Sequence, residues 1–193
     1  GKRSGAYSWS CYGCHPYVLL DYQNNLDSVF TLAHEMGHAI HSYYTNKSQP
    51  SVYSGYTIFV AEVASICNES LLLHHLLENI DSKDEKIYLI NNYLEKFRGT
   101  LFRQVMFAEF EMNIGKMAGE GQTLTAEALS AEYRRLNELY FGPNMVVDEQ
   151  IAVEWARIPH FYFDYYVFQY ATGYSAAIAL SKRILTEGES AVK

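Results

Sequence analysis

The chain has 193 residues, 49% of them hydrophobic, with 17 tyrosines and 10 phenylalanines. This composition predicts a folded globular chain with a single domain over residues 1–193, and it excludes a disordered one. A net charge of −7 argues against nucleic acid as a partner, three cysteines are too few for a disulfide framework, and no apolar run is long enough for a transmembrane helix. We therefore expect a cytoplasmic protein that binds neither nucleic acid nor a membrane.

The first predicted element is a short strand. YVLLDY at residues 17–22 combines β-branched and aromatic side chains and is followed by a Gln-Asn-Asn stop. Asn25 then provides an N-cap for a helix over residues 26–45. A loop at residues 46–55 separates this helix from a second one over residues 57–79.

The rest of the chain is predicted to be helical. A long amphipathic helix covers residues 84–117, with Gly99 as a weak point, and Thr125 caps a helix that ends near Tyr140. A helix over residues 149–157 is interrupted at Pro159, and a last helix begins near Phe161. The predicted fold class is mainly α, with a small β element.

A metal-binding pattern lies inside the first predicted helix. His34-Glu35-Met36-Gly37-His38 is an H-E-x-x-H sequence, and its two histidines lie one turn apart on the same face. Two imidazoles at this spacing can converge on one zinc ion. Glu35 lies next to that face, where its carboxylate can act as a general base on zinc-activated water.

A zinc site needs a third protein ligand, which must come from another segment. His41 lies seven residues after His34, about 10 Å along the helix axis, so the two cannot bind one ion. If the second helix packs antiparallel to the first, it offers Glu62 and Glu69 on one face. Height along the helix does not distinguish between these two carboxylates.

Four blocks of the sequence resemble, in the same order, the oligoendopeptidase F family of zinc peptidases, relatives of thimet oligopeptidase. They are GKRSGAY, HPYVLLDYQNNLDSVFTLAHEMGHAIHS, FVAEVASICNES and IPHFYFDYYVFQYATGYSAA. Family members are several times longer, so the resemblance implies a zincin-like helical catalytic domain of the gluzincin type. It would be the C-terminal part of a larger two-lobed α-helical peptidase, truncated at both ends. The chain also lacks an initiator methionine and ends inside a predicted helix.

The resemblance also implies a set of metal ligands. One Zn²⁺ ion would be held by His34, His38 and Glu62. Glu69 and Asp27 then become candidates for orienting the ligand imidazoles through their outer ring nitrogens. A plain surface charge is an equally good interpretation of each of these two carboxylates.

A peptidase must also stabilise a negatively charged oxygen in its tetrahedral intermediate. Tyr162, Tyr166 and Tyr170 are spaced by four residues and would form one stripe on the last helix, with His160 just before it. The family places a histidine and one or more tyrosines of this segment opposite the metal, which corresponds here to His160, Tyr162 and Tyr166. Such a stripe is equally typical of core packing, and which tyrosine meets the oxyanion stays open.

A second pattern, Cys11-x-x-Cys14-His15, has the spacing of a c-type haem attachment sequence. A haem also needs an oxidising compartment, a second axial ligand and an apolar pocket, whereas here Pro16 and a strand follow directly. The haem interpretation is therefore the weaker one. A redox-active cysteine pair stays open, although no thioredoxin-like βαβ pattern surrounds it.

Together these features predict a zinc-dependent endopeptidase that hydrolyses short oligopeptides. Glu35 would take a proton from the attacking water and pass it to the leaving amine. The alternatives are a peptidyl-dipeptidase or carboxypeptidase of the same zincin class, a c-type haem protein, and a catalytically inactive metal-binding fragment. The expected partners are short peptide substrates and the missing N-terminal half of the full-length protein.

Overall fold

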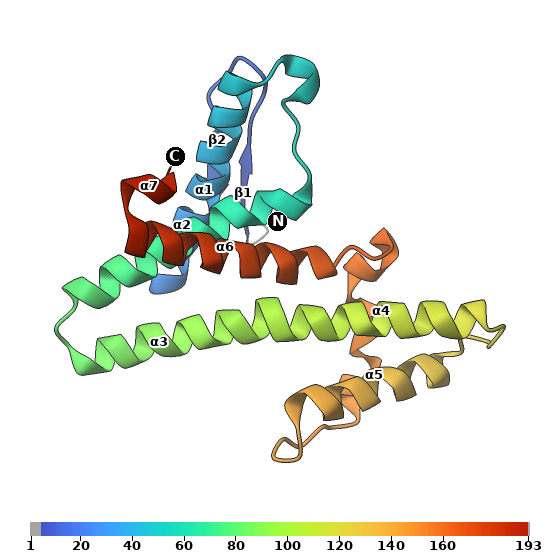
Figure 1. The fold of residues 1–193 in the computed structure, drawn as a ribbon. Helices are drawn as coiled ribbons and strands as arrows, with labels where there is room; N and C mark the ends of the chain where they lie inside the picture. Colours follow the sequence, from blue (N-terminus) through green and yellow to red (C-terminus); the bar gives the residue numbers. More distant parts are fainter. Residues whose placement is uncertain (1–4, 193) are drawn as a thin grey trace. The chain divides into compact units, whose positions relative to one another are not determined.

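A computed structural model describes residues 5–192 of the chain (Figure 1). Within this range the chain is mainly helical with one two-stranded sheet, which confirms the predicted fold class. None of the helices described has both the length and the apolar character needed to cross a membrane. The chain divides into two compact units: Leu94–Ala171, and the residues up to Tyr93 together with those from Thr172 onward.

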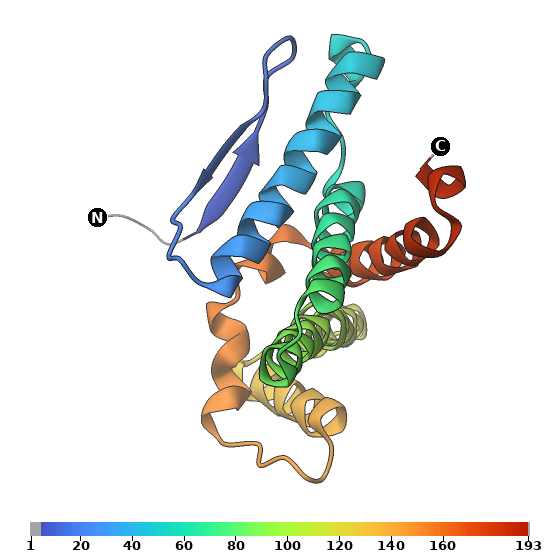
Figure 2. The same ribbon diagram turned by 90° about the vertical axis from the view of Figure 1, so that its left-hand side faces the viewer.

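The first unit begins with a β-hairpin. Strand β1 (Ala6–Trp9) pairs antiparallel with β2 (Tyr17–Leu20), in a register that runs from Ala6 opposite Leu20 to Trp9 opposite Tyr17. Figure 2 shows the hairpin lying along helix α1 (Leu26–Ser48). The sequence predicts β2, whose run YVLL is rich in β-branched and aliphatic residues, but not β1, whose run AYSW contains no β-branched residue.

Helices α1 and α2 (Ile58–Asn79) pack against each other in the first unit. Asn25 caps α1 as predicted, since its side chain accepts a hydrogen bond from Ser28 N at 2.9 Å. The pair is joined by a loop with one 3₁₀ turn, η1 (Ser51–Tyr53). The helices approach closely at Gly37, where a Cβ atom would lie 2.6 Å from the Cα of Ser65.

The remaining helices of the first unit pack on this pair. Phe30, Leu73 and Leu89 form a buried cluster that joins α1 and α2 to the first part of α3 (Lys83–Phe97). The hydroxyls of Ser70 and Ser181 lie 2.9 Å apart and connect α2 to α6 (Phe168–Glu187). A short helix, α7 (Glu189–Val192), follows α6.

The second unit is built around α4 (Arg103–Gly119) and α5 (Ala126–Phe141). Helical residues continue from α3 into α4 through a π-helical segment, η2 (Arg98–Phe102), which contains Gly99, the predicted weak point. Thr125 caps α5 as predicted and accepts a hydrogen bond from Ala128 N at 3.2 Å. The buried core comprises Met106, Phe107, Phe110, Tyr133, Leu136, Ile158 and Val167.

The helix predicted over residues 149–157 is present and is of the 3₁₀ type, whereas the predicted start of the last helix is wrong. The segment expected as a helix over residues 149–157 is a 3₁₀ helix, η3 (Gln150–Arg157), and a further 3₁₀ helix, η4 (Pro159–Phe163), occupies the expected start of the last helix. Helix α6 begins only at Phe168, because Asp164 and Tyr165 adopt left-handed conformations with φ of 51° and 52°.

The cause of this break is a buried carboxylate on α4. Glu111 is 5% exposed and accepts a hydrogen bond from the backbone N–H of Tyr165 at 3.1 Å. That N–H is therefore not available to a helical partner. One turn along α4, Gly115 leaves room for the Tyr165 phenol, which a Cβ atom at that position would contact.

Candidate metal centre

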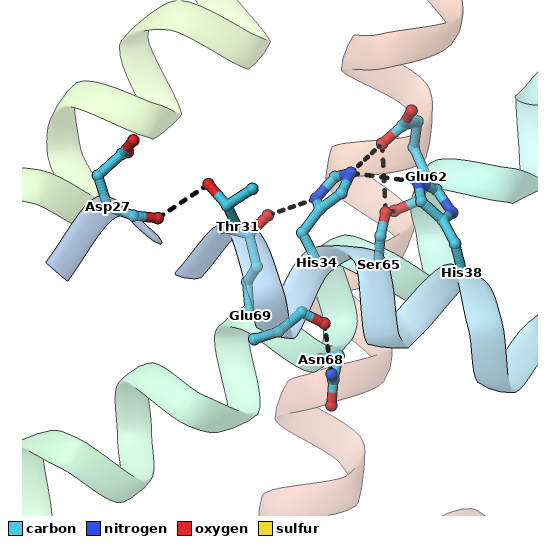
Figure 3. A network of polar contacts seen from close by, with 9 residues as sticks. Asp27, Thr31, His34, His38, Glu62, Ser65, Asn68 and Glu69 are labelled. Atoms are coloured by element: carbon cyan, nitrogen blue, oxygen red, sulfur yellow. Dashed lines mark hydrogen bonds and ion pairs between the residues drawn. The ribbon is translucent and has the colours of Figure 1, made fainter. Parts of the chain in front are cut away.

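Helices α1 and α2 bring the three predicted metal ligands together (Figure 3). The Nε2 atoms of His34 and His38 are 3.2 Å apart, and His34 Nε2 is 3.4 Å from Glu62 Oε2. The three ligand atoms all lie within 4.8 Å of one another. Ligands about 2.0–2.1 Å from a tetrahedral zinc ion are separated by about 3.3–3.4 Å, so the two short separations match such an ion.

The outer nitrogens of both imidazoles are occupied by hydrogen-bond acceptors. His34 Nδ1 lies 2.6 Å from Glu69 Oε1, and the ring of His38 hydrogen-bonds to the backbone carbonyl of Ala61. With the outer nitrogens as donors, each neutral imidazole would present an Nε2 lone pair to the centre. Two lone pairs and a carboxylate oxygen facing one point repel one another, unless a proton on His34 or a metal cation lies between them.

The pKa values of the two histidines shift in opposite directions. Burial, and then the neighbouring His34, lower the pKa of His38 to about 4, so that its imidazole is neutral at physiological pH. Burial also acts to lower the pKa of His34, but the hydrogen bond and charge of Glu69, followed by the charge of Glu62, raise it overall. The surrounding carboxylates therefore favour positive charge at this point.

Glu35 lies buried beside the ligands, with 7% of its surface exposed. Burial raises the pKa of its carboxyl group, and Glu62 adds to this, while His34 and a hydrogen bond from the backbone of Ser8 in β1 oppose it. The hairpin thus contacts Glu35, which the sequence predicts to be the general base. A carboxylate with a raised pKa is a stronger proton acceptor than an exposed one.

The candidates for orienting the ligands differ in outcome. Glu69 contacts His34 directly, as expected. Asp27 instead offers its backbone carbonyl to the Thr31 hydroxyl at 2.8 Å, and its carboxylate makes none of the described contacts with the imidazoles (Figure 3).

Two orienting groups were missed from the sequence. One is the carbonyl of Ala61, which leaves no trace in a residue pattern. The other is fully buried Ser65, whose hydroxyl donates to Glu62 Oε2 at 3.2 Å. A serine one helical turn after a ligand carboxylate is the signal that could have indicated Ser65.

The second unit contains an aromatic group around His160. The His160 ring stacks on Tyr166 with centroids 5.9 Å apart and meets Tyr170 edge-on at 6.0 Å. Tyr162 lies outside this group and is 85% exposed. The predicted helical stripe is wrong, because only Tyr170 lies on α6, but the structure still brings His160 and Tyr166 together.

Comparisons with known proteins identify relatives of this chain. The model of peptidase family M3 matches residues 1–193. Oligopeptidase PepF of Bacillus subtilis is 57% identical over 192 residues, which cover 100% of this chain and 29% of that protein. Oligoendopeptidase F (chromosomal) of Lactococcus lactis subsp. cremoris is 49% identical over 185 residues, covering 96% of this chain and 31% of the relative.

Solved structures give the same result. Oligoendopeptidase-F from Enterococcus faecium is 48% identical, with a TM-score of 0.75 over 86% of this chain and 30% of that one. A peptidase from Chlamydophila abortus, known from a crystal structure, is 47% identical in sequence. Its TM-score is 0.86, over 99% of this chain and 32% of that one. The chain thus spans about a third of the length of the relatives it matches. The resemblance stated from the sequence is confirmed, and the chain belongs to peptidase family M3.

Proposed function

We propose that this chain is the zinc-binding catalytic part of an oligoendopeptidase that hydrolyses short peptides. The observation that carries the proposal is the convergence of His34, His38 and Glu62 beside buried Glu35. Membership of peptidase family M3 supports it independently. The cytoplasmic location predicted from the sequence stays part of the proposal, and cell fractionation tests it.

The donor set suits zinc. His34, His38 and Glu62 would supply two imidazole nitrogens and one carboxylate oxygen, the number of protein ligands typical of a catalytic rather than a structural zinc site. When bound, the ion supplies Lewis acidity that makes water more acidic and a peptide carbonyl more electrophilic. Glu69 and the Ala61 carbonyl hold the two imidazole tautomers, and Ser65 holds the Glu62 carboxylate.

Glu35 would move the proton during hydrolysis. Its carboxylate accepts a proton from the water that attacks the peptide carbonyl and then delivers it to the leaving amide nitrogen. The low exposure of Glu35 keeps bulk water from competing for that proton.

His160 and Tyr166 would stabilise the developing oxyanion. Both carry hydrogen-bond donors, and their stacking fixes the two rings relative to each other without rearrangement during the reaction. Tyr162 was predicted for the same role and stays a prediction. Tyr166→Phe and Tyr162→Phe separate the two, since the variant that removes an oxyanion donor lowers kcat by about 10²–10³-fold.

The central experiment combines Glu35→Gln with two measurements. We expect zinc binding, followed by calorimetry, to be unchanged and kcat/KM on an internally quenched peptide to fall by about 10²–10⁴-fold. Glu78→Gln, an exposed carboxylate on α2, serves as the matched control and should retain full activity. Full activity of Glu35→Gln would overturn the proposed role.

Cleavage products distinguish the alternatives. An endopeptidase cuts blocked peptides internally, whereas a peptidyl-dipeptidase removes two residues at a time and needs a free carboxyl end. Zinc binding by the native protein with no turnover of any peptide would identify an inactive metal-binding fragment. The exposure of Cys11, Cys14 and His15 argues against the haem alternative, because a haem requires an apolar pocket.

A further inference from the structure

The turn that connects β1 to β2 carries two cysteines to which the proposed hydrolytic mechanism assigns no role. The backbone N–H of Cys14 donates to the carbonyl of Cys11 at 3.0 Å, so the two cysteines are the first and last residues of a β-turn. Gly13, the third residue, has φ of +81°, the left-handed conformation that a type II turn requires at this position. The conformation of the turn therefore depends on a glycine between the cysteines.

This turn places the two cysteines within the span of a disulfide. The end residues of a β-turn have Cα atoms less than about 7 Å apart, and disulfides join residues whose Cα atoms are about 4.4–6.8 Å apart. The Cα separation of this turn is thus compatible with a bond between Cys11 and Cys14. Both thiols are exposed and free in this structure.

Contacts with the end of α1 hold the turn in this conformation. The Tyr12 hydroxyl donates to the carbonyl of Gln49 at 3.1 Å, and the Asn46 side chain donates to the carbonyl of Cys11 at 3.4 Å. Because the turn is ordered before the bond forms, closing it costs less conformational entropy than in a free peptide. The approach is also open, since a hollow of about 430 Å³ beside Cys14 is lined by Tyr12, Asn46 and Lys47 among others.

The third cysteine provides an internal reference. Cys67 lies on α2, half-buried, and burial raises the pKa of its thiol. A thiol in this environment reacts slowly, because the thiolate is the reactive form. The two exposed thiols of the turn are therefore expected to react first.

We infer that Cys11 and Cys14 form a reversible dithiol–disulfide site that exchanges with low-molecular-mass disulfides. The thiolate of one cysteine attacks the small disulfide, forms a mixed disulfide and releases one small thiol. The second thiolate then attacks the protein sulfur of that mixed disulfide, forms the Cys11–Cys14 bond and releases the second small thiol. Two electrons and two protons pass from the protein to the small molecule, so its disulfide is reduced as the protein pair is oxidised.

Thiol trapping tests this site without reference to peptide hydrolysis. The protein is equilibrated with mixtures of oxidised and reduced glutathione and quenched with acid. It is then redissolved in neutral denaturant with N-ethylmaleimide, so that every remaining thiol is alkylated, and weighed by intact-mass spectrometry. We expect a species that has lost two hydrogens, carries no glutathione and retains one alkylated thiol, which peptide mapping assigns to Cys67. Glutathione bound separately to Cys11 and Cys14, or chains cross-linked through these residues, would overturn the inference.

Two variants make the test specific. Cys14→Ser removes one thiol of the pair, so Cys11 is expected to accumulate as a stable glutathione adduct. Cys67→Ala should leave formation of the Cys11–Cys14 disulfide unchanged. Gly13→Val retains both thiols but forces a branched side chain into the left-handed region, and should weaken ring closure by about fivefold or more at a fixed glutathione ratio. Unchanged closure in Gly13→Val would show that the turn geometry does not assist the bond.

Discussion

Gly37→Ala tests how the fold brings the candidate metal ligands together. Gly37 lies between the two histidines on the face of α1 that meets α2. A Cβ atom there would lie 2.6 Å from Ser65 Cα, 2.9 Å from Ala64 O and 3.0 Å from Ser65 N. All three are backbone atoms, so no side-chain rotation can relieve the overlap and the helices must separate.

The size of the effect follows from these distances. Non-bonded carbon atoms sit about 3.5–4.0 Å apart, so Ser65 must retreat by about 1 Å. Zinc sites tolerate changes in ligand distance of only about 0.2 Å. Because Glu62 lies one turn from Ser65 on the same helix, the shift moves its carboxylate away from the imidazoles. We expect zinc affinity to fall by on the order of 10–100-fold or more, the loss that even an outer-shell partner causes.

The stability of the metal-free chain should change less than its zinc affinity. Overpacking costs about 1–3 kcal/mol, and the higher helix propensity of alanine offsets up to about 1 kcal/mol of this. Chelator competition measures the affinity, and urea unfolding measures the stability. Gly173→Ala is the matched control. Its Cβ atom would lie 3.4 Å from the Cβ of Glu62, which is an ordinary van der Waals separation, so zinc affinity should be unaffected. Wild-type affinity in Gly37→Ala would refute the reasoning.

Three further predictions concern single carboxylates. Glu69→Ala removes the acceptor from His34 Nδ1 and should weaken zinc binding by about 10–100-fold in chelator competition; an unchanged affinity would contradict the orienting role. Burial raises the pKa of Glu111, so its contribution to stability is fully present below its unfolded pKa and is lost as pH rises through its folded pKa. The free energy of unfolding of the native chain minus that of Glu111→Gln should therefore decrease from acid to neutral pH in urea titrations, and an increase would be inconsistent with this. Asp164 has a left-handed backbone with φ of 51° and lies close to Glu111. Asp164→Gly relieves the strain and removes the charge, so it should stabilise the chain by up to about 1 kcal/mol. A loss of stability would show that the conformation is not strained.

The sequence predicts α1 well because the signals that define this helix lie within the helix and at its N-cap. Asn25 marks the start of the helix, and the four-residue spacing of His34 and His38 places both histidines on the same face. Helical height could not distinguish Glu62 from Glu69 as the third ligand. The structure shows why, because the two carboxylates contact opposite nitrogens of the same imidazole, Glu62 at Nε2 and Glu69 at Nδ1 of His34.

The errors arise where distant residues decide the local conformation. The predicted last helix fails because Glu111 on α4 takes the backbone N–H of Tyr165, a contact across 54 positions of the chain. Strand β1 was missed because its pairing with β2 and its packing on α1 stabilise it, rather than any alternation within four residues. Neither cause can be inferred from a periodic pattern.

The central claim is that His34, His38 and Glu62 together hold one zinc ion. Zinc K-edge X-ray absorption on the zinc-loaded protein tests it most directly, because it distinguishes nitrogen and oxygen ligands at about 2.0–2.2 Å from sulfur at about 2.3 Å. We predict one zinc per chain with two imidazoles, no sulfur, and loss of this signal in Glu62→Ala. A spectrum dominated by sulfur, or one unchanged in Glu62→Ala, would contradict the account.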